Sequence, residues 1–213
     1  STSISVDVIQ LVPSEDRETV KALLNARGKV DLVIPRGSAA LIRMVVDESS
    51  VPTIETGAGV CHVYIDEFAD LSKAVPIIIN SKVQRPSVCN AAETLLVHAA
   101  VADSFMPTAL KALHEAGVIV HCDAASLAIA KSANIPATLA TDENFCTEYG
   151  TLEMNVAIVD SVDAASAHIA KYGTQHTEAI ISENKEVVKR FIALADCAAV
   201  MVNTSTRFTD GEQ

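Results

Sequence analysis

The chain has 213 residues, of which 49% are hydrophobic and 20% charged, a balance typical of a globular protein with a sizeable core. Its net charge of −11 argues against non-specific binding to nucleic acid or to an anionic membrane. An anionic substrate stays possible, because a site inside an acidic protein can be locally positive. No apolar run reaches membrane-spanning length, and the sequence contains no signal-peptide pattern.

Apolar and polar segments alternate along the chain between expected strands and expected helices. The expected strands are Val6–Val12, Val30–Ile34, Thr53–Ile54, Cys61–Ile65, Thr94–His98, Val118–His121, Asn155–Asp160, Glu178–Ser182 and Ala198–Asn203. The expected helices are Glu15–Asn25 with Ser14 as N-cap, Ser38–Val46, Asp70–Lys82, Ser104–Ala116, Ala124–Lys131, Val162–Tyr172 and Glu186–Asp196. This alternation predicts an α/β fold with a largely parallel sheet and helices on both faces.

Two features of the layout concern domain organisation. The glycine-rich loop at 55–59 is the best candidate for a domain boundary. The chain opens directly into an expected strand and stops without a closing element, as a piece of a longer protein does.

The five cysteines form neither a disulfide framework nor a zinc pattern, because their number is odd and no CxxC pair occurs. We therefore expect no metal site and a cytoplasmic protein, since a reducing cytosol fits free thiols best. The four cysteines other than Cys89 lie within expected strands or apolar surroundings, where a buried structural thiol is the simpler interpretation.

Cys89 lies in the segment RPSVCNAAE at 85–93, between an expected helix and an expected strand. Pro86 and Ser87 predict a short helical turn with Cys89 in its first turn, where backbone amides and the helix dipole favour a thiolate. Arg85 adds positive charge nearby. A thiolate attacks carbonyl carbons well, so Cys89 is a candidate nucleophile. From these residues alone, a small buried hydrophobic cysteine is the alternative.

Four other loops carry candidate binding or catalytic residues. Gly37 and Ser38 follow an expected strand and open a helix, where free N–H groups can cradle a phosphate. Glu55 ends a strand and is either a general base or a solvated loop acid. His176 lies in a polar loop, where it contacts an anion, transfers a proton or caps a helix. Arg207 follows the last strand, at the carboxyl end where α/β proteins place ligands, and its guanidinium suits carboxylate or phosphate.

Five ordered segments together resemble the gamma-glutamyl phosphate reductases, a family of the aldehyde dehydrogenase superfamily. They are VDLVIPRGS at 30–38, CHVYID at 61–66, RPSVCNAAETLLVH at 85–98, AHIAKYGTQHTE at 167–178 and NTSTRFTDG at 203–211. The resemblance implies an aldehyde dehydrogenase-like fold. Residues 1–59 would be the C-terminal part of a Rossmann-like cofactor domain, 60–200 the catalytic domain and 201–213 a truncated tail.

The resemblance also implies a reaction of proline biosynthesis. The thiolate of Cys89 would attack L-glutamyl 5-phosphate and displace phosphate, and NADPH would reduce the resulting thioester to L-glutamate 5-semialdehyde. Gly37 and Ser38 match the turn that approaches the pyrophosphate of the cofactor, and Glu148 resembles the glutamate that binds the nicotinamide ribose.

The resemblance leaves the substrate contacts and the partners as expectations. Arg207 and His176 are the candidates for binding the carboxylate or phosphate of the acyl phosphate substrate, from their residue types and loop positions. At full length a homo-oligomer is expected, with glutamate 5-kinase as the functional partner.

Three alternatives stay open. The module also occurs fused behind a glutamate kinase in bifunctional pyrroline-5-carboxylate synthases. A non-enzymatic binding module would have an unreactive Cys89. An oxidising aldehyde dehydrogenase would need Glu55, 34 residues before Cys89, to activate water against the thioester. We expect Glu55 not to be essential, because hydrolysis would waste the intermediate. We also expect the isolated chain to be inactive, because its cofactor domain is incomplete.

Overall fold

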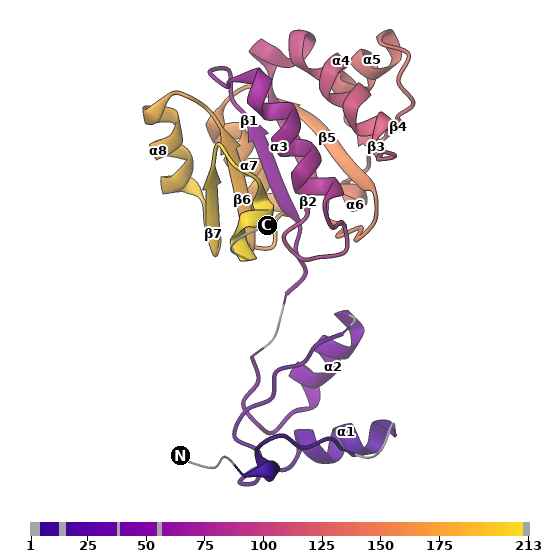
Figure 1. Cartoon of the computed structure of the whole chain (residues 1–213), viewed down its shortest axis with the longest axis vertical. Helices are drawn as coiled ribbons and strands as arrows, with labels where there is room; N and C mark the ends of the chain where they lie inside the picture. Colours follow the sequence, from indigo (N-terminus) through magenta and orange to yellow (C-terminus); the bar gives the residue numbers. More distant parts are fainter. Residues whose placement is uncertain (1–4, 13–15, 38, 55–56, 211–213) are drawn as a thin grey trace. The chain divides into compact units, whose positions relative to one another are not determined.

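The computed structural model describes residues 5–12, 16–37, 39–54 and 57–210. The chain divides into two compact units, and the division falls between Gly57 and Ala58 in the sequence (Figure 1). None of the described helices has the length and hydropathy needed to cross a membrane. The assignment of the first unit to a cofactor domain stays a prediction.

The first unit contains a 3-10 helix, η1, and two α-helices. Their bounds are η1 Val6–Val8, α1 Arg17–Leu24 and α2 Ala39–Glu48. The N-cap of α1 is Asp16, whose carboxylate accepts a hydrogen bond of 3.1 Å from the amide of Glu18. The sequence placed this cap at Ser14, which lies outside the described residues.

The strand expected at 6–12 is wrong. The hydroxyl of Ser5 accepts a hydrogen bond from the amide of Asp7 and starts a 3-10 turn there instead. The apolar side chains of this segment point into solvent, since Val6 is 91% exposed. The strands expected at 30–34 and 53–54 shrink to isolated bridges, one between Val33 and Thr53 and one between Val30 and Arg27. Within the described residues these short runs have no neighbouring strand long enough to extend a ladder.

The second unit contains a seven-stranded sheet in the order β4-β3-β5-β2-β1-β6-β7, with every pair parallel (Figure 1). The strands are β1 Cys61–Ile65, β2 Ala92–His98, β3 Ile119–Cys122, β4 Thr138–Leu139, β5 Glu153–Val159, β6 Thr177–Ile181 and β7 Ala199–Val202. The helices are α3 Leu71–Val83, α4 Ala99–Glu115, α5 Ala124–Ser132, α6 Asp142–Phe145, α7 Val162–Tyr172, α8 Lys185–Leu194 and the 3-10 helix η2 Thr206–Asp210. The predicted parallel α/β sheet is confirmed.

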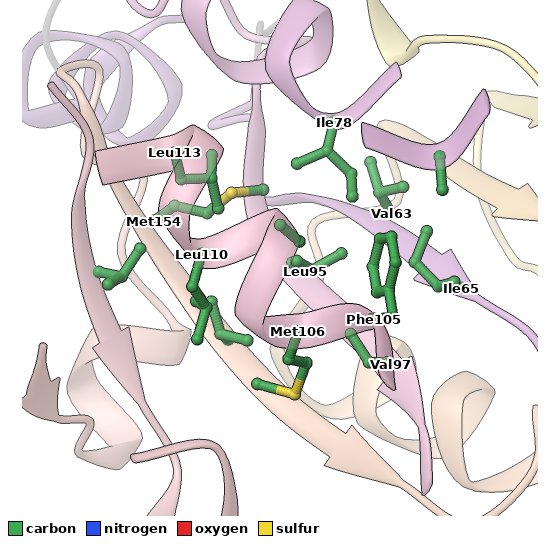
Figure 2. Close-up of a cluster of buried hydrophobic side chains, with 14 of the residues drawn as sticks. Val63, Ile65, Ile78, Leu95, Val97, Phe105, Met106, Leu110, Leu113 and Met154 are labelled. Carbon is green, nitrogen blue, oxygen red and sulfur yellow. The ribbon is translucent and has the colours of Figure 1, made fainter. Parts of the chain in front are cut away.

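Side chains alternate between the two faces of each strand, and this alternation builds two separate cores. Val63 of β1 and Leu95 of β2 pack with α3, α4 and α5 in the larger cluster. Figure 2 shows Phe105 of α4 among these side chains. The next residues along the same strands, Tyr64 and Leu96, join α7 and α8 on the opposite face. The sheet is therefore covered by helices on both faces, as predicted.

Because all the strands are parallel, their amino ends meet at one edge of the sheet. The four central strands are β5, β2, β1 and β6. The segments that enter them are 146–152, 84–91, 57–60 and 173–176. This edge, called the amino edge below, collects the loops that carry Glu148, Cys89 and His176.

Candidate active site

Cys89 lies at the amino edge in the loop that joins α3 to β2, and its side chain is half-buried. The helical turn expected around it is wrong, because residues 86–90 form turns and bends. The loop is short and must reverse the chain into a fully buried strand, which it does through a hydrogen bond of 3.0 Å from the amide of Ala91 to the carbonyl of Val88. Cys89 therefore lies in a turn and not in the first turn of a helix.

Gly59 packs directly against the backbone of Cys89. A Cβ atom built on Gly59 would lie 1.6 Å from the carbonyl oxygen of Cys89 and 2.7 Å from its Cα atom. No side chain fits there, so the close approach of the two segments requires glycine. The Cys89 loop is thus held in place by the strand entrance beside it.

Cys61, the first residue of β1, holds the backbone carbonyl of Cys89 through a hydrogen bond. Its thiol is fully buried and donates a hydrogen bond of 3.3 Å to the carbonyl oxygen of Cys89. Burial, with the nearby Glu178 carboxylate, raises the pKa of the Cys61 thiol well above its usual range, so the sulfur keeps its proton and acts as a donor. The sequence identified Cys61 only as a structural thiol.

His176 enters the same cluster just before β6. Its Nδ1 atom lies 3.9 Å from the sulfur of Cys61 and 2.9 Å from the hydroxyl of Thr177. The Thr177 hydroxyl is in turn 2.9 Å from the hydroxyl of Thr209 in η2. The structure therefore brings His176 next to the backbone anchor of Cys89, as an expected site residue, although its contact with a substrate stays a prediction.

Arg207 lies at the amino edge, and its expected position at the carboxyl end of the last strand is wrong. After β7 the chain returns to α3, where the hydroxyl of Ser81 donates a hydrogen bond of 3.0 Å to the hydroxyl of Ser205. The Arg207 side chain is buried, donates to the side chain of Gln84 at 2.8 Å and pairs with Asp210 at 3.5 Å.

The contacts of Asp210 connect Arg207 to the cysteine loop. The carboxylate of Asp210 also accepts a hydrogen bond of 2.9 Å from the side-chain amide of Asn90, the residue after Cys89. Asn90 is fully buried. The contacts of Arg207 with Gln84 and Asp210 brace the Cys89 loop from both sides, and direct substrate binding by Arg207 stays a prediction.

The other expected site residues are distributed over both units. Glu148 is exposed on the loop before β5 and therefore at the amino edge. Gly37 belongs to the first unit, with a φ of +153°, and a Cβ atom there would lie 2.7 Å from the side chain of Leu41. Ser38 and Glu55 lie outside the described residues. Their cofactor and base roles stay predictions.

A buried ion pair that the sequence analysis did not predict joins the two elements on either side of the Cys89 loop. Lys82 of α3 and Glu93 of β2 approach to 2.6 Å with both side chains fully buried. Burial raises the pKa of Glu93 to about 7 and lowers the pKa of Lys82, and the charge of each partner offsets part of the shift. The sequence signal was a charged residue within the apolar run AAETLLV.

The remaining cysteines differ in exposure. Burial raises the pKa of Cys122 to about 12 and also raises the pKa of Cys197. Cys146 is exposed at the end of α6, so its expected apolar surroundings are wrong. Among the described residues, no three histidine, cysteine or carboxylate side chains are grouped to hold a metal ion.

The fold and the amino edge together describe one class of protein: a parallel α/β domain with a cysteine-bearing loop at the amino ends of its central strands. A model of the aldehyde dehydrogenase family matches residues 3–127. The chain belongs to the aldehyde dehydrogenase family, and the expected aldehyde dehydrogenase-like fold is confirmed.

Two curated relatives and one solved structure are similar to most of the chain. It is 55% identical to the gamma-glutamyl phosphate reductase of Thermobifida fusca and 53% identical to that of Kineococcus radiotolerans, over 99% of its length. It spans about half of these relatives, 50% and 49%. The crystal structure of gamma-glutamyl phosphate reductase from Thermotoga maritima superposes with a TM-score of 0.89 at 45% identity, over 94% of this chain and 47% of that one. The resemblance inferred from the sequence motifs is confirmed.

Proposed function

We propose that this chain is part of an enzyme that reduces L-glutamyl 5-phosphate to L-glutamate 5-semialdehyde with release of phosphate, and that Cys89 is its nucleophile. The observation that carries the proposal is the identity of 55% with a gamma-glutamyl phosphate reductase over nearly the whole chain. The geometry supports it, because the half-buried thiol of Cys89 lies on a loop whose backbone is fixed by Gly59 and Cys61.

The reaction uses Cys89 twice. Its thiolate attacks the carbonyl carbon of the acyl phosphate, a C–S bond forms, and the C–O bond to phosphate breaks to leave a thioester. Turn amides of the same loop are the candidates for stabilising the oxyanion. When bound, NADPH supplies the hydride that reduces the thioester, and the thiolate of Cys89 leaves as the aldehyde forms.

The residues predicted from the sequence are proposed to bind the cofactor and the substrate. Gly37 and Ser38 precede α2 in the sequence and are proposed to approach the cofactor pyrophosphate, because free N–H groups at a helix start can cradle a phosphate. Glu148 is exposed at the amino edge and available to a ribose hydroxyl. His176 and Arg207 are proposed to attract the substrate anion to the same edge.

The proposed cellular setting follows from the substrate. A kinase can make an acyl phosphate from a carboxylate, and glutamate 5-kinase in proline biosynthesis is the proposed supplier. A cytoplasmic homo-oligomer is proposed, with NADPH as the proposed reductant. A reductase module fused to its kinase is the alternative, and the length of the whole natural protein distinguishes the two.

The experiment compares Cys89→Ala with Cys146→Ala in the protein at its full natural length. Phosphate-dependent reduction of NADP⁺ by glutamate 5-semialdehyde should disappear in Cys89→Ala. Cys146 is exposed and has no proposed role in this reaction, so its variant should match the wild type. Activity of Cys89→Ala above a few per cent of the wild type rejects the proposal.

A further inference from the structure

The ion pair of Lys82 and Glu93 spans the base of the Cys89 loop. Lys82 lies in the last turn of α3 and Glu93 is the second residue of β2, so residues 84–91 form the loop between them. The Nζ and Oε2 atoms are 2.6 Å apart, and neither side chain is exposed. The pair therefore fixes the distance between the two ends of the loop that presents the thiol.

The same carboxylate reaches a second loop of the amino edge. The other oxygen of Glu93, Oε1, accepts a hydrogen bond of 3.5 Å from the amide of Gly150. The amide of Tyr149 also contacts the carboxylate and, like that of Gly150, offsets part of its raised pKa. Gly150 and Tyr149 belong to the loop that carries Glu148. One buried carboxylate thus connects the end of α3, the start of β2 and the Glu148 loop.

Stability alone is a weak reason for placing two charges here. Burying a charged pair costs desolvation energy, and apolar side chains of similar size are often as stabilising. Apolar side chains make no directional contacts. An ion pair with its amide hydrogen bonds therefore fixes the distances between its atoms more narrowly than apolar packing does. Around the pair, the other charged or titratable groups are Glu153 on β5, Tyr149 in its loop and the buried thiol of Cys61.

We propose that Lys82 and Glu93 are positioning residues for Cys89, holding the thiol loop and the Glu148 loop in the arrangement that the reaction needs. The inference rests on the proposed function, because it assigns a role in the reaction of Cys89. Neither side chain reaches the substrate, since both are fully buried. A misplacement of about 1 Å in a reacting group costs on the order of 100-fold in rate, so loosening the loop should be visible in turnover.

The test is the double variant Lys82→Met/Glu93→Leu in the protein at its full natural length. It removes both charges and keeps most of the volume. Two readouts are followed: the rate at which iodoacetamide alkylates Cys89, measured by peptide mass spectrometry, and kcat and KM for the proposed substrate. The control removes the exposed pair of Arg190 and Asp163, 2.6 Å apart between α8 and α7.

The expected result is a fall of about 10-fold or more in kcat and in the alkylation rate of Cys89, with the melting temperature close to the wild type. The control variant should match the wild type in all three measurements. Wild-type alkylation and kcat in the folded double variant would overturn the inference and leave a purely structural pair.

If the double variant does not fold, the single variant Glu93→Gln is measured in its place. The alkylation rate of Cys89, divided by that of the exposed Cys146, should be lower in this variant than in the wild type at the same pH, because the carboxylate that pairs with Lys82 is lost. Equal ratios in the two proteins would overturn the inference. Failure of the proposed function looks different, because Cys89→Ala would then stay active whatever these variants do.

Discussion

Replacing Gly59 with alanine is expected to displace the Cys89 loop. The new methyl carbon would lie 1.6 Å from the carbonyl oxygen of Cys89, whereas ordinary contacts begin at 3.4 Å. The two backbone segments must therefore separate by more than about 1 Å, a shift that costs on the order of 100-fold when it moves a reacting group. Overpacking of this kind also destabilises a fold by about 1–3 kcal/mol.

Gly57→Ala is the matched control, because a Cβ atom on Gly57 would meet no described residue within 4 Å. The assay measures turnover and the alkylation rate of Cys89 in both variants, together with their melting temperatures. Gly59→Ala should lose about 100-fold in turnover, while Gly57→Ala should keep it. Equal turnover and equal alkylation of Cys89 in the two variants would refute the close contact between Gly59 and Cys89.

Four further predictions concern residues around the site and in the core. Cys61→Ala removes the donor to the carbonyl of Cys89 and should lower the free energy of unfolding in urea by about 1–2 kcal/mol, with slower alkylation of Cys89; an unchanged alkylation rate would contradict its positioning role. Arg207→Met removes the contacts with Gln84 and Asp210 and should cost about 1–3 kcal/mol in the same measurement, and a neutral effect would contradict them. Burial lowers the pKa of His168 from 6.5 to about 4, so the folded protein binds this proton more weakly than the unfolded chain. Its contribution to stability is therefore complete above pH 6.5 and is lost as the pH falls towards 4. In His168→Phe the melting temperature should depend less on pH between 6.5 and 4 than in the wild type. The same pH dependence of the melting temperature in both proteins would contradict the burial effect. Glu55→Gln should keep most reductase activity, and a loss as large as that of Cys89→Ala would favour the oxidising alternative.

Much of the second unit was predictable because local signals there agree with the tertiary structure. The helix Val162–Tyr172 was predicted with its observed bounds, since Ser161 caps its start and Gly173 ends it. The start of α4 was missed because His98 caps it, with its Nδ1 atom accepting a hydrogen bond from the amide of Ala100. Histidine is not among the residues that signal a helix start.

The first unit was harder to predict, because a strand forms only beside a pairing strand, and the local sequence does not show whether one is present. Val6 and Leu11 have the apolar character of strand residues, yet they are more than 90% exposed and pair with no strand in the described chain. Val33 and Thr53 pair only as an isolated bridge, and the described residues around them form no longer strand ladder.

The sequence motif around Cys89 predicts the reactive thiol, and this role stays a prediction. The contacts that hold its loop could not be predicted, because the contact with Gly59 joins residues far apart in the sequence. The hydrogen bond between Asn90 and Asp210 spans 120 residues. Such contacts follow from the order of the strands, and no local pattern encodes them.

Whether Cys89 carries the acyl group is tested most directly by a reaction without phosphate. The protein at its full natural length is mixed with glutamate 5-semialdehyde and NADP⁺, and NADPH formation is followed before the protein is digested for mass spectrometry. The proposal predicts one NADPH per active site, then no further reaction, and an acyl group on the peptide that contains Cys89. Continued turnover with water as acceptor, or an acyl group on another residue, would contradict it.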